Sequence, residues 1–166
     1  MNLNGNSGVS VKARRQVAQI LNHALADEFA LSAAARDYHW NVTGPYCRNL
    51  NEIFDEQYHQ IDQWIEKIGA RARLIGITAR TGWSELIKAP RFTPARGAGL
   101  SAPAMMAELI ELHDCMARQL RVDAAVCAMK SGDAGTADFL NELIEYHETA
   151  SWMLGELRED RELARA

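Results

Sequence analysis

The chain has 166 residues, of which 48% are hydrophobic and 24% are charged, a composition typical of one soluble globular domain. Its net charge of −4 excludes a general attraction to DNA phosphates, and no window holds the roughly 18 apolar residues that a membrane span requires. Three scattered cysteines without CxxC spacing indicate reduced thiols in a cytoplasmic protein.

Polar Asn, Gly and Ser residues dominate the N-terminus, and we expect residues 1–10 to form a flexible tail without a signal peptide. Residues 11–166 then form a single domain. Apolar residues recur at helical spacing over about residues 11–40, which predicts a first long helix. The breakers Gly44 and Pro45 should end it.

A second helix is predicted over about residues 49–75, with Gly76 as its C-terminal signal. The next 26 residues, 77–102, contain two of the four prolines and several glycines. They read as a long connection, with a short helical turn in the sequence WSELIK.

Ser101 followed by Pro103 indicates the start of a third helix, which should continue to about Lys130. The sequence SGDAGT breaks the chain again, and apolar residues from Phe139 to Leu157 predict a fourth helix. No strand candidate occurs. Four amphipathic helices with one long middle connection predict an all-α four-helix bundle.

The second helix carries a stripe of metal-ligand residue types. At about 100° per residue, Asp55, His59, Asp62, Glu66 and Ala70 lie on one face. Solvent, basic partners or a bound cation must offset the repulsion between these carboxylates. Oxygen ligands with an imidazole suit iron or another divalent metal such as zinc, and a solvated charged face is the alternative.

The sequence DYHWNVTGPYCRNLNEIFDEQY resembles the signature of the Dps family, the mini-ferritins known as DNA-binding proteins from starved cells. The likeness continues in ARLIG, SGDAGTADFL and HETASWML, and covers nearly the whole chain after the tail. The resemblance implies a ferritin-like bundle that assembles into a homododecameric cage. Such a cage oxidises ferrous iron with hydrogen peroxide or oxygen, stores ferric iron and protects against oxidative stress.

The resemblance also implies an oxidation site that two subunits share. His39 and Asp55 match the first histidine and the first aspartate of the family's ligand set. The second histidine falls on Asn51, the partner's aspartate on Glu66, and the partner's glutamate on Ala70. His39, Asp55 and Glu66 are therefore the expected catalytic metal ligands. Asn51 offers only a weaker neutral oxygen, and Ala70 cannot bind metal.

Two interpretations follow for this altered site. In the first, the site is degenerate: it is kept for assembly and oxidises little or no iron. In the second, the site has moved to His59 and Asp62, which would meet their copies in a second subunit across a two-fold axis. His59 could also be an ordinary surface histidine. Glu56 and His59 have the Glu-x-x-His spacing of di-iron bundles, but the chain has no second such pair, which disfavours a site inside each bundle.

Two further groups have more than one reading. Trp40 and Trp64 would pack in the core or donate electrons near the site. Asp133, Asp138 and Glu142 resemble the family's acidic three-fold pore for ferrous ions, although Asp133 would equally serve only to oppose the helix dipole at the start of the last helix.

DNA binding is expected to be weak or absent, because residues 1–10 carry no charge and only Lys12, Arg14 and Arg15 follow. The sequence predicts no membrane association. A cytoplasmic location is expected, and association with the nucleoid stays open.

Overall fold

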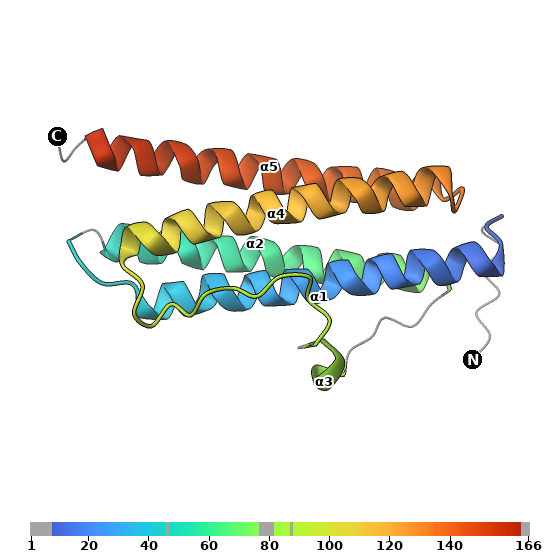
Figure 1. The fold of residues 1–166 in the computed structure, drawn as a ribbon, viewed down its shortest axis with the longest axis horizontal. Helices are drawn as coiled ribbons and strands as arrows, with labels where there is room; N and C mark the ends of the chain where they lie inside the picture. Colours follow the sequence, from blue (N-terminus) through green and yellow to red (C-terminus); the bar gives the residue numbers. More distant parts are fainter. Residues whose placement is uncertain (1–7, 46, 77–81, 87, 164–166) are drawn as a thin grey trace.

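A computed structural model describes residues 8–45, 47–76, 82–86 and 88–163. The long helices are α1 (Val11–Asn41), α2 (Cys47–Leu74), α4 (Ala102–Met129) and α5 (Ala134–Leu163), and the short α3 (Trp83–Leu86) lies in the connection between α2 and α4 (Figure 1). The described residues contain no strand, so the predicted all-α four-helix bundle is confirmed. No helix among them is long and apolar enough to cross a membrane.

The order of helix directions requires a long crossover. α1 and α2 run antiparallel, and so do α4 and α5, whereas α2 and α4 run in the same direction (Figure 1). The chain must therefore travel the length of the bundle between the end of α2 and the start of α4. Figure 1 shows the last part of this connection extended along α1.

A few serine, proline and glycine residues determine where the helices begin and end. The hydroxyls of Ser10 and Ser101 each accept the backbone N–H three residues on, at 3.2 Å and 3.4 Å, and cap α1 and α4 as N-cap serines do. Pro103 stands in the first turn of α4, as predicted. Gly76, with φ of 79°, supplies the left-handed backbone that follows α2, whereas the C-cap of α1, Val42, is in extended conformation and Gly44, with φ of 112°, lies in the turn that leads to α2.

The structure places two predicted boundaries more closely. α2 begins at Cys47, two residues before the predicted start. The predicted break in SGDAGT is confirmed at residues 131–133, and α5 begins inside that sequence, at Ala134. Asp133 accepts the backbone N–H of Thr136 at 2.9 Å and caps the helix there. Most of the predicted tail, residues 1–7, lies outside the described residues.

All four long helices contribute to one hydrophobic core. Tyr38 of α1 meets Phe54 of α2 edge to face, with ring centroids 5.8 Å apart. Full burial of each large apolar side chain stabilises the fold by about 1.5–3 kcal/mol. The largest fully buried side chains are Tyr38, Phe54, Leu21, Leu31, Ile61, Ile68, Met105, Leu109, Met116, Leu120, Leu140 and Leu143.

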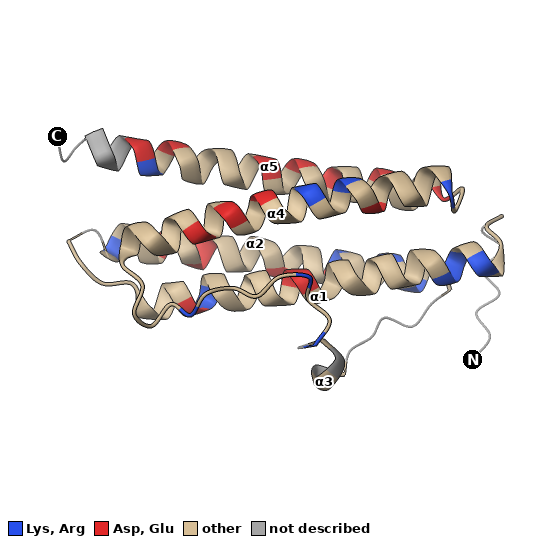
Figure 2. Cartoon of the chain, viewed as in Figure 1, with Lys and Arg blue, Asp and Glu red and all other residues tan. Residues whose placement is uncertain are grey.

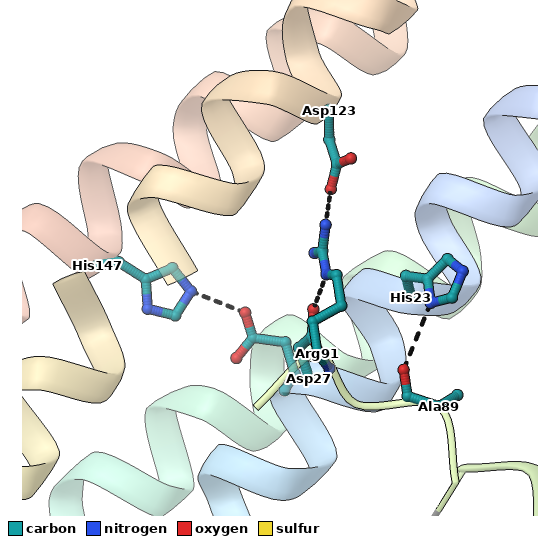
Figure 3. Close-up of polar contacts among 7 residues, drawn as sticks. His23, Asp27, Ala89, Arg91, Asp123 and His147 are labelled. Carbon is teal, nitrogen blue, oxygen red and sulfur yellow. Dashed lines mark hydrogen bonds and ion pairs between the residues drawn. The ribbon is translucent and has the colours of Figure 1, made fainter. Parts of the chain in front are cut away.

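Arg91 anchors the connection to the bundle (Figure 3). Its Nε and backbone N donate to the two carboxylate oxygens of Asp27 on α1, at 2.6 Å and 2.7 Å. Its Nη1 donates to Asp123 on α4 at 2.7 Å. One guanidinium therefore joins the connection to two helices, and His23 adds a 3.4 Å contact to the carbonyl of Ala89.

We predict that Arg91→Met destabilises the subunit by about 3 kcal/mol, because it leaves the fully buried Asp27 without its partner. Guanidinium denaturation measures the change. Arg118→Met is the matched control, since it breaks an exposed ion pair with Glu111 and should change stability little. Equal losses in the two variants would contradict the anchoring role.

Candidate functional site

A reciprocal pair of hydrogen bonds joins the end of α1 to the start of α2. The Asn51 side-chain amide donates to the His39 carbonyl at 2.7 Å. The His39 ring contacts the Asn51 carbonyl through Nδ1 at 3.1 Å. Because a carbonyl can only accept, this bond assigns the proton to Nδ1 and leaves Nε2 with a free lone pair. Asn51 thus orients His39, and we name this pair the His39–Asn51 clasp.

Asp55 lies next to two histidines. Its Oδ1 is 4.0 Å from His39 Nδ1, and its Oδ2 is 3.8 Å from His59 Nε2. Its side chain is 42% exposed, and that of His59 is 61% exposed, so both remain open to a ligand from outside the subunit. Carboxylates and imidazoles are side chains that bind divalent transition metals, although these three are not placed to hold an ion by themselves within one subunit.

Tyr58 holds this group together. Its hydroxyl donates to Asp55 Oδ1 at 2.7 Å, and this bond raises the pKa of the phenol, which stays a donor at neutral pH. Its ring lies edge-on to His39 and tilted against His59, with centroids 5.8 Å and 4.3 Å away. The guanidinium of Arg36 covers the ring at 4.4 Å.

Asp62 belongs to a different arrangement on the same helix face. Its Oδ1 accepts from the Ser32 hydroxyl and its Oδ2 from Arg36 Nη2, both at 2.6 Å. Each oxygen of this carboxylate is therefore already bound by α1. A basic partner offsets the charge of Asp62, whereas Asp55 has only neutral or weakly basic neighbours.

Glu66 and Ala70 lie further along α2, and both are exposed. Glu66 has no hydrogen bond or ion pair within the described chain. Eleven residues of helix separate it from Asp55 by about 16 Å, so both cannot bind one metal ion within one subunit. Consistently, the described residues of one subunit contain no group of three His, Cys, Asp or Glu side chains placed to hold a metal ion.

Comparisons with known proteins agree on one family. Residues 18–164 match the ferritin-like domain of the Ferritin family. The chain is 33% identical over 149 residues to the low temperature-induced protein all0458 of Nostoc sp., a match that covers 90% of this chain and 83% of the relative. It is 28% identical over 140 residues to DNA protection during starvation protein 2 of Bacillus anthracis, covering 84% and 94% of the two chains.

Solved structures give the same result. Dps from Thermosynechococcus elongatus has a TM-score of 0.81 at 27% identity, covering 88% of this chain and 92% of that one. A Dps protein from Bacillus brevis has a TM-score of 0.83 at 26% identity, covering 89% and 98%. The chain belongs to the Dps family of ferritin-like proteins. The resemblance to the Dps family, carried by the sequence DYHWNVTGPYCRNLNEIFDEQY, is confirmed.

In this Dps protein the three predicted pore residues differ in setting. Asp133 is buried, caps α5 through Thr136 and forms an ion pair with Arg71 at 3.1 Å. The Thr136 hydroxyl also donates to Asp133 Oδ2, at 2.7 Å. Asp138 and Glu142 are exposed, one turn apart on α5. Asp133 therefore acts at the N-terminus of α5, where its helix-dipole reading placed it, and it does so as the N-cap.

The two tryptophans also differ. Trp64 packs against Phe139 and Tyr146, with ring centroids 6.0 Å and 5.8 Å away, which confirms core packing for this residue. Trp40 is 71% exposed, so the core-packing prediction was wrong for it within one subunit. Sequence reasoning missed Tyr58 and Arg36 as neighbours of the site. Their positions, three residues after Asp55 and three before His39, are the helical spacing that could have indicated them.

We predict that Asp133→Ala lowers the stability of the Dps subunit by about 2 kcal/mol, because α5 loses its N-cap. Thermal unfolding followed by circular dichroism measures this. Asp138→Ala, an exposed carboxylate of the same helix, should leave the unfolding temperature nearly unchanged. If Asp133→Ala behaved like Asp138→Ala, the carboxylate would not be a cap.

Proposed function

We propose that this Dps protein oxidises ferrous iron at a site shared by two subunits and stores the ferric product inside a dodecameric cage. One observation carries the proposal. His39, Asp55 and His59 gather at one exposed place, whereas Glu66, a free carboxylate on the same helix, lies about 16 Å away. The donor set is therefore half complete in one chain.

A second copy can complete it. A two-fold axis that crosses α2 halfway between Asp55 and Glu66, near residues 60 and 61, sets the helix against its own antiparallel copy. Asp55 of each subunit would then face Glu66 of the other. The arrangement yields two equivalent sites per dimer, and the family's cages contain such dimers as building units.

The proposed roles follow from the contacts. His39 binds iron through Nε2, because Nδ1 is held by the clasp. Asp55 supplies negative charge, and His59 replaces the imidazole that Asn51 no longer offers. Asp62 serves to fix Arg36 and α1 rather than to bind metal. Two ferrous ions each give one electron to hydrogen peroxide, which takes up two protons and leaves as two waters. Zinc, with the same ligand preferences, would compete for the site.

The competing function is a cage with little oxidation. It is favoured by Ala70, which removes a carboxylate ligand, and by the use of the Asn51 amide in the clasp. Asp138 and Glu142 would still attract cations to a three-fold pore. DNA association would depend on basic residues at the start of α1, but acidic residues are prominent on α4 and α5 (Figure 2). We expect weak, salt-dependent DNA binding at most, and a cytoplasmic location.

Iron oxidation separates the two functions. Ferrous salt and hydrogen peroxide are mixed with the purified protein without oxygen, and ferric absorbance is followed against buffer and against albumin at equal concentration. A rate clearly above both controls supports oxidation at the site. A rate equal to the controls, with an intact cage by light scattering, would leave only the structural function.

We predict that His39→Ala weakens ferrous binding at least tenfold, because the variant loses the only site imidazole whose tautomer is fixed. Calorimetric titration with ferrous ion under argon measures it. His23→Ala removes a surface histidine of α1 outside the site and is the control. Unchanged affinity in His39→Ala would remove this residue from the proposed ligand set.

A further inference from the structure

Three ionisable side chains lie end to end in the apolar core. Glu28 of α1, His147 of α5 and His113 of α4 are each 0% exposed. His147 Nε2 is 2.8 Å from Glu28 Oε1, and His147 Nδ1 is 2.9 Å from His113 Nδ1. Figure 3 shows the His147 ring directed from α5 towards α1. We name these three residues the core relay. It takes no part in the proposed iron site.

Counting protons fixes the direction of the core relay in its neutral form. A neutral Glu28 has one O–H, and it donates to His147 Nε2. His147 then carries its proton on Nδ1 and donates to His113 Nδ1. His113 in turn carries its proton on Nε2. Each short contact thus holds one proton, and no group needs a charge.

Burial favours this neutral form. Burial raises the pKa of Glu28 well above its ordinary value of 4.5. It lowers the pKa of His147 to about 3, and it lowers that of His113 well below 6.5, with the neighbouring His147 as a further cause. An ion pair between Glu28 and His147 would keep two charges in a dry core, which costs several kcal/mol per ion.

The surrounding groups supply little compensating charge. Arg91 is held by Asp27 and Asp123, and burial raises the pKa of both carboxyls. From α4, Asp114 acts weakly on His113, and it already accepts from Ser151 at 2.6 Å.

From α5 the neighbour is the partly buried Tyr146, and from α2 it is the exposed Glu56, whose charge acts on the Tyr146 phenol. The ends of the core relay, Glu28 Oε2 and His113 Nε2, are buried without a partner within the described chain, and so is the Tyr146 hydroxyl. The carboxylates that favour an added proton are Asp27 for His147 and Asp114 for His113, and for each histidine burial outweighs them, so that its pKa stays lowered.

We propose that the core relay makes the folded subunit acid-sensitive: it admits no further proton, so mild acid favours the unfolded chain, whose histidines are free to take protons up. The device needs only one subunit and is independent of iron chemistry. It predicts that a cage of this protein loses subunit stability between pH 6 and pH 5.

The two kinds of residue act in opposite directions. Histidines kept neutral in the fold stabilise it fully only above about pH 6.5, and that stability is lost as the pH falls. Glu28 keeps a proton that the unfolded chain releases above about pH 4.5, so its contribution is lost as the pH rises. Between pH 6 and pH 5, unfolding of the core relay takes up two protons and releases one.

Guanidinium unfolding from pH 7.5 to pH 5, at one fixed subunit concentration, tests the proposal. Each net proton changes the unfolding constant about tenfold per pH unit. In Glu28→Gln, the unfolding constant should rise about tenfold more per pH unit of acidification than in the unmodified protein. The glutamine amide still donates to His147, but it has no proton to release on unfolding. In the triple variant Glu28→Met, His113→Leu, His147→Leu, the unfolding constant should rise about tenfold less per pH unit than in the unmodified protein. His23→Gln, outside the core relay, should match the unmodified protein.

Infrared difference spectroscopy adds a readout that survives poor folding of the triple variant. The spectrum of the unmodified protein minus that of Glu28→Gln, at pH 7, should show the carbonyl band of a protonated carboxylic acid. A carboxylate band in its place would mean that Glu28 is ionised and would overturn the proposal. An acid dependence in Glu28→Gln equal to that of the unmodified protein would overturn it as well.

Discussion

The parallel course of α2 and α4 is the constraint on which the rest of the fold depends. It obliges the connection to run the length of the bundle, and an extended segment has no helix of its own to stabilise it. Arg91 anchors this segment by placing one cation between the fully buried carboxylate of Asp27 on α1 and the carboxylate of Asp123 on α4, which is 13% exposed. The same contact stabilises all three groups, since none of them could remain charged in the interior alone.

Apolar periodicity and end signals were sufficient to predict the bundle. Ser10, Ser101 and Gly76 act at helix ends as those residue types ordinarily do. The start of α5 could not be placed in the same way, because Gly135 and Thr136 have poor helix propensity and only the cap from Asp133 makes them helical. Such a cap depends on side-chain geometry and on Arg71, 62 residues away in the sequence.

In the candidate site, too, the sequence pattern predicted one part and side-chain contacts decided the other. The stripe on α2 was visible as a row of carboxylates and a histidine, and their common face follows from helix geometry alone. The spacing could not show that residues of α1 bind one of these carboxylates and leave another free of basic partners. Ser32 and Arg36 engage Asp62, whereas Tyr58 and the two histidines surround Asp55. The core relay was missed for a related reason: Glu28, His113 and His147 are far apart in sequence and meet only when three helices pack.

The clasp at Asn51 links metal chemistry to the hairpin between α1 and α2. The Asn51 amide, at the position where the family resemblance expects a ligand histidine, is also the donor that ties the end of α1 in place. A histidine at this position would bring an imidazole and remove the amide that binds the His39 carbonyl. Any substitution of Asn51 therefore alters the α1–α2 hairpin and the donor atoms beside His39 at the same time.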